Sequence, residues 1–129
     1  MDAEGRVLLG DIGESTTRYE LDGILSKETN YDYVWKKVLE NRNKAGLIVI
    51  DLSDLARLEK SHVPAPDQMV RERNRILGNI DAFAGRLLNS ADKERDLVMV
   101  IAPSPSREQS DLKNVFTPVI ACGPGFHKG

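Results

Sequence analysis

Three short apolar runs limit what the chain can fold into, because a long helix-like segment separates the first two and a non-helical excursion separates the last two. The runs span residues 47–50 (LIVI), 97–101 (LVMVI) and 118–122 (PVIAC). Their apolar residues are continuous, a pattern typical of strands that are covered on both faces of a parallel sheet. We therefore expect three core strands, the first of which ends near Asp51.

Two amphipathic helices are expected around these runs. Apolar residues recur at helical spacing over about 31–42, and again over about 67–89. Pro66 precedes the second segment, at a position where a missing N–H costs nothing. Thr29, followed three positions later by Asp32, resembles a capping box for the first helix.

Glycines suggest where these helices end and how closely one of them packs. Gly46 supplies a residue that tolerates positive φ, and we expect the first helix to stop there. Gly78 and Gly85 lie within the second helix, where each glycine costs roughly 1 kcal/mol relative to alanine unless close packing requires it. This helix is therefore expected to press tightly against a sheet. The expected core residues are Ile48, Ile80, Phe83, Leu87, Val100 and Val119.

The order of strand, helix and strand predicts the α/β class. We expect a mostly parallel sheet with flanking helices in three layers. The 129 residues suffice for a single α/β unit, with an irregular part over 1–30 that holds one short strand near 7–9, and an α/β core over 31–129. Because no closing helix follows the last strand, we expect the unit to be a fragment of a larger domain.

Composition excludes several partners. The 18 basic residues against 20 acidic ones leave a formal charge of −2, without the basic excess that attracts nucleic acid. The longest apolar run has six residues against roughly 20 for a membrane-spanning helix, so no membrane segment is expected in this chain. A single cysteine, Cys122, excludes an internal disulfide and is expected to be an inert thiol in the core.

Polar residues follow the expected strands, at the edge where ligands gather in parallel sheets. The candidate ligand-edge residues are Asp51, Ser53, Asp54, Ser104, Ser106, Gly123 and Gly125. Asp51 and Asp54, with hydroxyls nearby, have the oxygen ligands that a divalent cation prefers. Alternatively, Asp51 caps the strand end and Asp54 caps a turn. The glycines near the end of the chain either offer backbone N–H groups to an anion or simply turn the chain.

Other chemical motifs are weak. The chain has neither a GxxxxGK[ST] loop nor a GxGxxG fingerprint, so nucleotide binding by those routes is unsupported. His62 and His127 lie in polar, loop-like stretches and are expected to be surface residues. No GxSxG elbow is present to expose a nucleophilic serine, and no catalytic residue is assigned.

Four segments in order resemble one enzyme superfamily. LIVIDLSDLARLE, RNRILGNIDAFAGRLLN, DLVMVIAPSPS and TPVIACGPGF are similar to the second half of the alkaline phosphatase superfamily, which includes sulfatases, nucleotide pyrophosphatases and cofactor-independent phosphoglycerate mutases. The similarity covers roughly residues 47–126, and its most specific piece is NIDAFAGRLLN. The resemblance implies a partial alkaline-phosphatase-like domain.

The resemblance also implies that the family's two-metal site has degenerated. Asp54 falls on a metal-binding aspartate position, but Leu58 occupies the accompanying histidine position. The S-D-H-G stretch that holds the second metal corresponds to residues 102–105, whose sequence is APSP. Most of the coordination that two-metal phosphoryl transfer needs is therefore absent.

The first hypothesis is a non-catalytic, degenerate domain fragment with a scaffold or binding role and no cofactor. One alternative is a metal-dependent phosphohydrolase or phosphomutase, using zinc, manganese or magnesium, whose site is completed outside this chain. Another is a free-standing flavodoxin-like module that binds a small anion or a protein. The expected partners are the remainder of the parent protein and a second copy bound through an exposed sheet edge. The resemblance allows a bacterial-type, exported parent and leaves a cytoplasmic one open.

Overall fold

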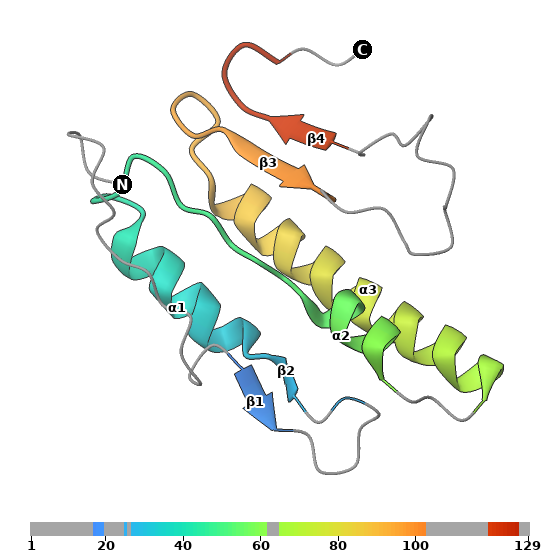
Figure 1. Cartoon of the computed structure of the whole chain (residues 1–129). Helices are drawn as coiled ribbons and strands as arrows, with labels where there is room; N and C mark the ends of the chain where they lie inside the picture. The colour runs from blue at the N-terminus through green and yellow to red at the C-terminus, as the bar shows by residue number, and fades with distance from the viewer. Residues whose placement is uncertain (1–16, 20–24, 26, 62–64, 103–118, 127–129) are drawn as a thin grey trace. The chain divides into compact units, whose positions relative to one another are not determined.

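The computed structural model describes residues 17–19, 25, 27–61, 65–102 and 119–126. The elements in these ranges are β1 (Thr17–Tyr19), β2 (Lys27–Thr29), α1 (Tyr31–Asn41), α2 (Asp54–Lys60), α3 (Pro66–Ser90), β3 (Val98–Ile101) and β4 (Val119–Cys122) (Figure 1). The chain divides into two compact units, Met1–Ile80 and Asp81–Gly129, and the division falls within α3. No helix in the described ranges combines the length and the apolar character needed to cross a bilayer.

The expectation of a mostly parallel, three-layer sheet is wrong. The described strands form two separate two-stranded sheets, β1 with β2 and β3 with β4, and both pairs are antiparallel. In the second pair, Val98 stands opposite Cys122 and Ile101 opposite Val119. A continuous apolar run indicates that both faces of a strand are covered by other parts of the protein. It does not indicate whether the neighbouring strand runs parallel or antiparallel to it. The α/β expectation is thus replaced by helices combined with two antiparallel pairs.

The strand expected over 47–50 is also absent. The chain between α1 and α2 is drawn in Figure 1 without an arrow, and residues 47–50 belong to no ladder among the described strands. Ile48, expected in the core, has 38% of its surface exposed, and Val49 has 81%. β-branched residues favour extended backbone, but a strand also needs a partner.

Helix α1 forms where periodicity predicts it, with a different cap. The side chain of Asn30 accepts a hydrogen bond from the Tyr33 N–H at 3.2 Å, so Asn30 is the N-cap and the expected Thr29 capping box is wrong by one residue. At the other end, Arg42 keeps right-handed helical angles and its N–H donates to the Val38 carbonyl. The helix therefore ends before Gly46 and does not use it.

The core of the first unit is built by α2, α3 and Leu25, which lies two residues before β2. Leu25, Leu58 and Ile76 are almost fully buried and form one cluster. The partly buried residues packed against this cluster are Leu55, Met69 and Ile80. Leu58, which the resemblance aligns with a metal-binding histidine position, contributes its side chain to this core.

Helix α3 begins at Pro66 as expected, but its glycines are not pressed against a neighbour. A Cβ built at Gly78 or at Gly85 would meet no atom within 4 Å, so the expected tight packing is wrong at both positions. Phe83 is 2% exposed, in agreement with its expected core position.

The second unit contains the β3–β4 pair, whose side chains are more exposed than expected. Val119, expected in the core, is 52% exposed, and Cys122 is an exposed free cysteine, not a buried one. A two-stranded sheet has few neighbours with which to cover its apolar residues, which accounts for both differences.

Candidate functional site

Asp54 is the best-defined candidate site residue. It is the first residue of α2, and its side chain is buried. Oδ1 accepts hydrogen bonds from the backbone N–H and the hydroxyl of Thr29, both at 2.9 Å, and a further bond from the Arg57 guanidinium. Oδ2 accepts from the Tyr31 hydroxyl at 3.1 Å. Four protein donors thus surround one carboxylate.

Some of the contacts of Asp54 are local in the sequence, and the others come from distant residues. Asp54 lies in the first turn of α2, where the positive end of the helix dipole favours a carboxylate. Arg57 follows one helical turn later and pairs with it, whereas Thr29 and Tyr31 belong to β2 and α1. The carboxylate therefore connects α2 to the end of β2 and the start of α1.

The hydrogen bonds determine what Asp54 is able to do chemically. An ionised carboxylate has about four lone-pair sites for hydrogen bonds. Three of the four donors are on Oδ1 and one is on Oδ2, so a metal ion at Oδ1 would have to displace protein donors, and one at Oδ2 would share the carboxylate with the Arg57 guanidinium. The described geometry matches a structural anchor more closely than an open metal site.

A second buried carboxylate lies next to Thr29 on β2. Glu28 is 2% exposed and pairs with the Arg75 guanidinium on α3. Arg75 also pairs with Glu72, one turn earlier on the same helix. Adjacent residues of one short strand thus make charged or polar contacts with α2 and α3, and sequence analysis identified neither Glu28 nor Arg75. The only sign of this ion pair in the sequence is that Glu28 and Arg75 carry opposite charges, and they lie 47 positions apart.

Asp51 and Ser53, the other candidates at this edge, lie in a different environment from Asp54. The Ser53 hydroxyl donates to Asp51 Oδ2 at 3.2 Å, and this bond is exposed to solvent. Asp51 is itself exposed, whereas Asp54 is buried. The two carboxylates expected to share a cation therefore lie in unlike surroundings, one in solvent and one among protein donors.

Gly123 and Gly125 form the turn that follows β4. Both have positive φ, +148° and +84°. A Cβ on Gly123 would lie 2.6 Å from the Asp96 carbonyl oxygen, so close approach of the backbone requires glycine there. The Phe126 N–H donates to the Gly123 carbonyl within this turn at 3.2 Å. The turn itself thus accounts for glycine at both positions, without any need for anion binding.

Several expected site residues lie outside the described residues. These are Ser104, Ser106, His62 and His127, together with Pro103 and Pro105 of the expected second metal position. Within the ranges that the structure does describe, no three or more His, Cys, Asp or Glu residues are grouped so that they could hold a metal ion.

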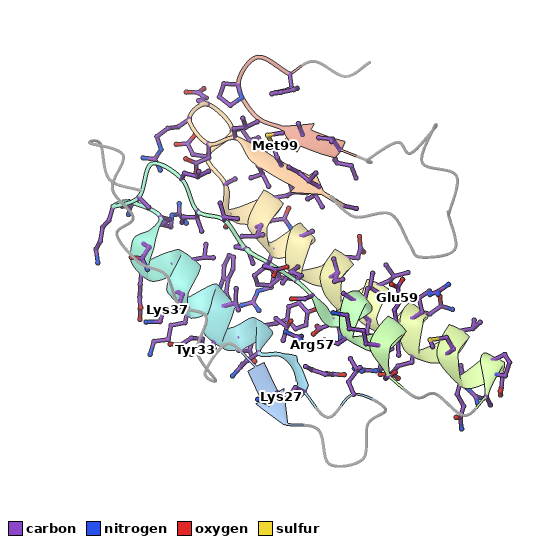
Figure 2. All side chains as sticks on the ribbon, viewed as in Figure 1. Lys27, Tyr33, Lys37, Arg57, Glu59 and Met99 are labelled. Atoms are coloured by element: carbon purple, nitrogen blue, oxygen red, sulfur yellow. The ribbon has the colours of Figure 1, made fainter. Side chains whose placement is uncertain are left out.

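An apolar surface on β3 and β4 is a second candidate site. Residues paired across an antiparallel ladder share a face, which places Met99 beside Ala121 and Ile101 beside Val119. Leu97 directly precedes β3 and is also exposed. We call these five residues the hairpin face; Leu97, Met99, Ile101 and Val119 are each about half exposed. Figure 2 labels Met99 on β3.

Comparison of the chain with protein-family models, with curated protein sequences and with solved structures gives no match. Function is therefore argued from the residues and contacts described above.

Proposed function

We propose that this chain is a non-catalytic scaffold or binding module, as expected for an alkaline-phosphatase-like sequence that has lost its metal ligands. The observation that carries the proposal is the engagement of Asp54 by four protein donors. Asp54 is the one residue to which the resemblance assigns a retained metal-binding role. With its oxygens used inside the protein, and Leu58 in the core at the histidine position, the residues favour a structural use of this region.

The binding role is supported by apolar strand residues that the described fold leaves exposed. The hairpin face presents four large apolar side chains, and Ile48 and Val49 are exposed in the first unit. Exposed apolar patches on a protein surface commonly mark sites of association. The partner we propose is a second copy of the chain, bound through an exposed strand.

The non-catalytic part of the proposal is tested by metal-dependent unfolding. A metal that binds the folded chain at 100 times its Kd stabilises it by about 2.7 kcal/mol. We expect elemental analysis of the purified chain to find no stoichiometric zinc, manganese or magnesium, and we expect the melting midpoint to be unchanged when these metals are added.

A matched pair of variants locates any metal effect. A rise of several degrees with metal in the native chain and in Asp51→Asn, but not in Asp54→Asn, would assign a metal to Asp54. That result would contradict the proposal and favour a metal-dependent phosphohydrolase or phosphomutase.

The binding part is tested by sedimentation of the full chain over a range of concentrations. We expect a dimer that dissociates on dilution. A chain that stays monomeric at high concentration would contradict self-association.

A further inference from the structure

Strand β2 buries two adjacent polar residues, and each of them contacts a different helix. Glu28 is 2% exposed and Thr29 is 3% exposed. Because successive side chains of a strand point to opposite faces, the two side chains enter different surroundings. Glu28 pairs with the Arg75 guanidinium on α3, whereas the N–H and the hydroxyl of Thr29 donate to the Asp54 carboxylate on α2. Helix α3 thus presents a basic group to the strand, and α2 presents an acidic one.

Two further charged residues hold these groups in place. Arg57 pairs with Asp54 on α2, and Glu72 pairs with Arg75 on α3. Both pairs join residues one helical turn apart on the same helix, so they form wherever these helices form. The charge that each helix presents to β2 is therefore a property of the helix itself.

A shift of β2 by one residue would exchange these contacts. A strand of three residues has little pattern of its own to fix its register, and a one-residue slip moves every side chain to the opposite face. In one direction of slip, Glu28 takes the place of Thr29, and Lys27 takes the place of Glu28. Glu28 then faces the Asp54 carboxylate, while Lys27 faces the Arg75 guanidinium. Like charges would meet at both helices.

A shift in the other direction is opposed by α1. It would bring Asn30 into the place of Thr29 and draw it away from the first turn of this helix. Asn30 is the N-cap, and its side chain accepts a hydrogen bond from the Tyr33 N–H at 3.2 Å. Without this cap, an N–H group of the first turn loses its acceptor.

We propose that the order of charges in β2, with Lys27 before Glu28, determines the register in which this strand packs on α2 and α3. The two buried contacts then exclude a shifted strand as well as hold the native one. This register concerns the first unit alone and is independent of metal binding and of self-association, so it goes beyond the proposed function. Figure 2 labels Lys27 on β2.

Exchange of the two charges in the full chain tests the proposal, because it leaves composition and net charge unchanged. In the double variant Lys27→Glu/Glu28→Lys, a strand shifted by one residue places an acidic side chain at Arg75 and a basic one at Asp54. We therefore expect this variant to adopt the shifted register. Nuclear Overhauser contacts between Thr29 and Asp54 should be lost, and contacts between position 28 and Asp54 should replace them.

A neutral variant and a control variant complete the experiment. Lys27→Gln/Glu28→Gln removes the charges that distinguish the two registers, so we expect two sets of NMR signals for β2, with the shifted register populated to at least about 10%. The matched control Asp67→Arg/Arg71→Asp exchanges an ion pair on α3 whose side chains are 71% and 73% exposed. It should keep one set of signals and the native contact between Thr29 and Asp54.

The outcomes decide the proposal in each case. A folded charge-exchange variant in which Thr29 still contacts Asp54, or in which neither position contacts it, would overturn the proposal. If that variant does not fold, the neutral variant decides. Two registers in the neutral variant would support the proposal, whereas a single native register, or loss of folding there too, would overturn it.

Discussion

At the scale of single residues, the hydrogen bonds around Asp54 are those of a structural carboxylate and differ from those expected of a metal ligand. Its oxygens accept hydrogen bonds from a strand residue, a tyrosine and an arginine that lie in three different elements. Removing this carboxylate would leave the buried Thr29 donors without this acceptor, and would take one charged partner from the Arg57 guanidinium, whose side chain is 33% exposed. The contacts therefore imply that Asp54 matters for stability.

We expect Asp54→Ala to lower the free energy of unfolding by about 3 kcal/mol, because buried donors and a charge lose their partner. The exposed control Asp51→Ala should change it by less than about 0.5 kcal/mol. Urea unfolding followed by circular dichroism measures both. Equal, small effects of the two substitutions would show that the Asp54 network contributes little.

Two glycines provide a second test at this scale. Gly123→Ala should destabilise the chain by about 1–3 kcal/mol, since φ is positive there and a Cβ would approach the Asp96 carbonyl oxygen. Gly78→Ala should instead stabilise it by up to about 1 kcal/mol, because the position is helical and a Cβ meets open space. Thermal unfolding distinguishes the two signs, and a stabilising Gly123→Ala would contradict the described turn.

Sequence analysis identified Asp54 but not its environment. The residues that bind it lie 23 and 25 positions earlier, apart from Arg57. Nothing in the local spacing of Thr29 and Tyr31 indicates that they turn towards α2. The same is true of Glu28 and Arg75, because a pairing between distant elements depends on the tertiary fold. Residue type and local spacing thus pointed to a candidate carboxylate, whereas its partners required the structure.

At the scale of elements, α1 carries a small charge cluster on its surface. The Lys37 ammonium lies 5.4 Å from the centre of the Tyr33 ring and 3.5 Å from Glu40 Oε2. Tyr33 and Lys37 are both labelled on this helix in Figure 2. Coulombic attraction to Tyr33, followed by attraction to Glu40, raises the pKa of Lys37 above its ordinary value of 10.5.

We expect Tyr33→Phe to lower the pKa of Lys37 more than Glu40→Gln does, because the tyrosine is the larger cause. Since the pKa is raised in the folded chain, the stabilising contribution is complete below pH 10.5 and is lost as pH rises through the higher folded value. NMR titration of the Lys37 side chain in each variant measures which substitution lowers the pKa of Lys37 more. A larger decrease in Glu40→Gln would contradict it.

The longer elements were predictable, and the shorter ones were not. Helices α1 and α3 follow the apolar periodicity closely, and β3 and β4 coincide with apolar runs. Strands β1 and β2 have three residues each, too few for alternation to be visible, and α2 has seven. The run at 47–50 has strong β-propensity but no described partner, which shows that propensity alone does not make a strand.

At the scale of the whole molecule, strand direction was the main error of the sequence-based expectation. The order strand, helix, strand, excursion and strand suggested right-handed crossovers, yet β3 pairs directly with β4 in antiparallel fashion. Strand direction depends on which strands meet, and continuous apolar residues are compatible with either arrangement. The fold class therefore had to come from the pairing itself.

Both units of the chain leave apolar strand-like residues exposed. A two-stranded sheet is marginally stable on its own in water and gains from a partner that covers its apolar residues. The hairpin face and the 47–50 segment both expose such residues, in the second and the first unit respectively. The second copy that we propose as the partner would cover residues of this kind.

Sedimentation velocity of the full chain, with and without added zinc, tests this central claim most directly. We expect a reversible dimer whose dissociation constant is the same in both conditions, because the proposed association depends on strand residues and the Asp54 carboxylate accepts hydrogen bonds from within the protein. A monomer at every concentration, or a chain that binds zinc through Asp54, would contradict it.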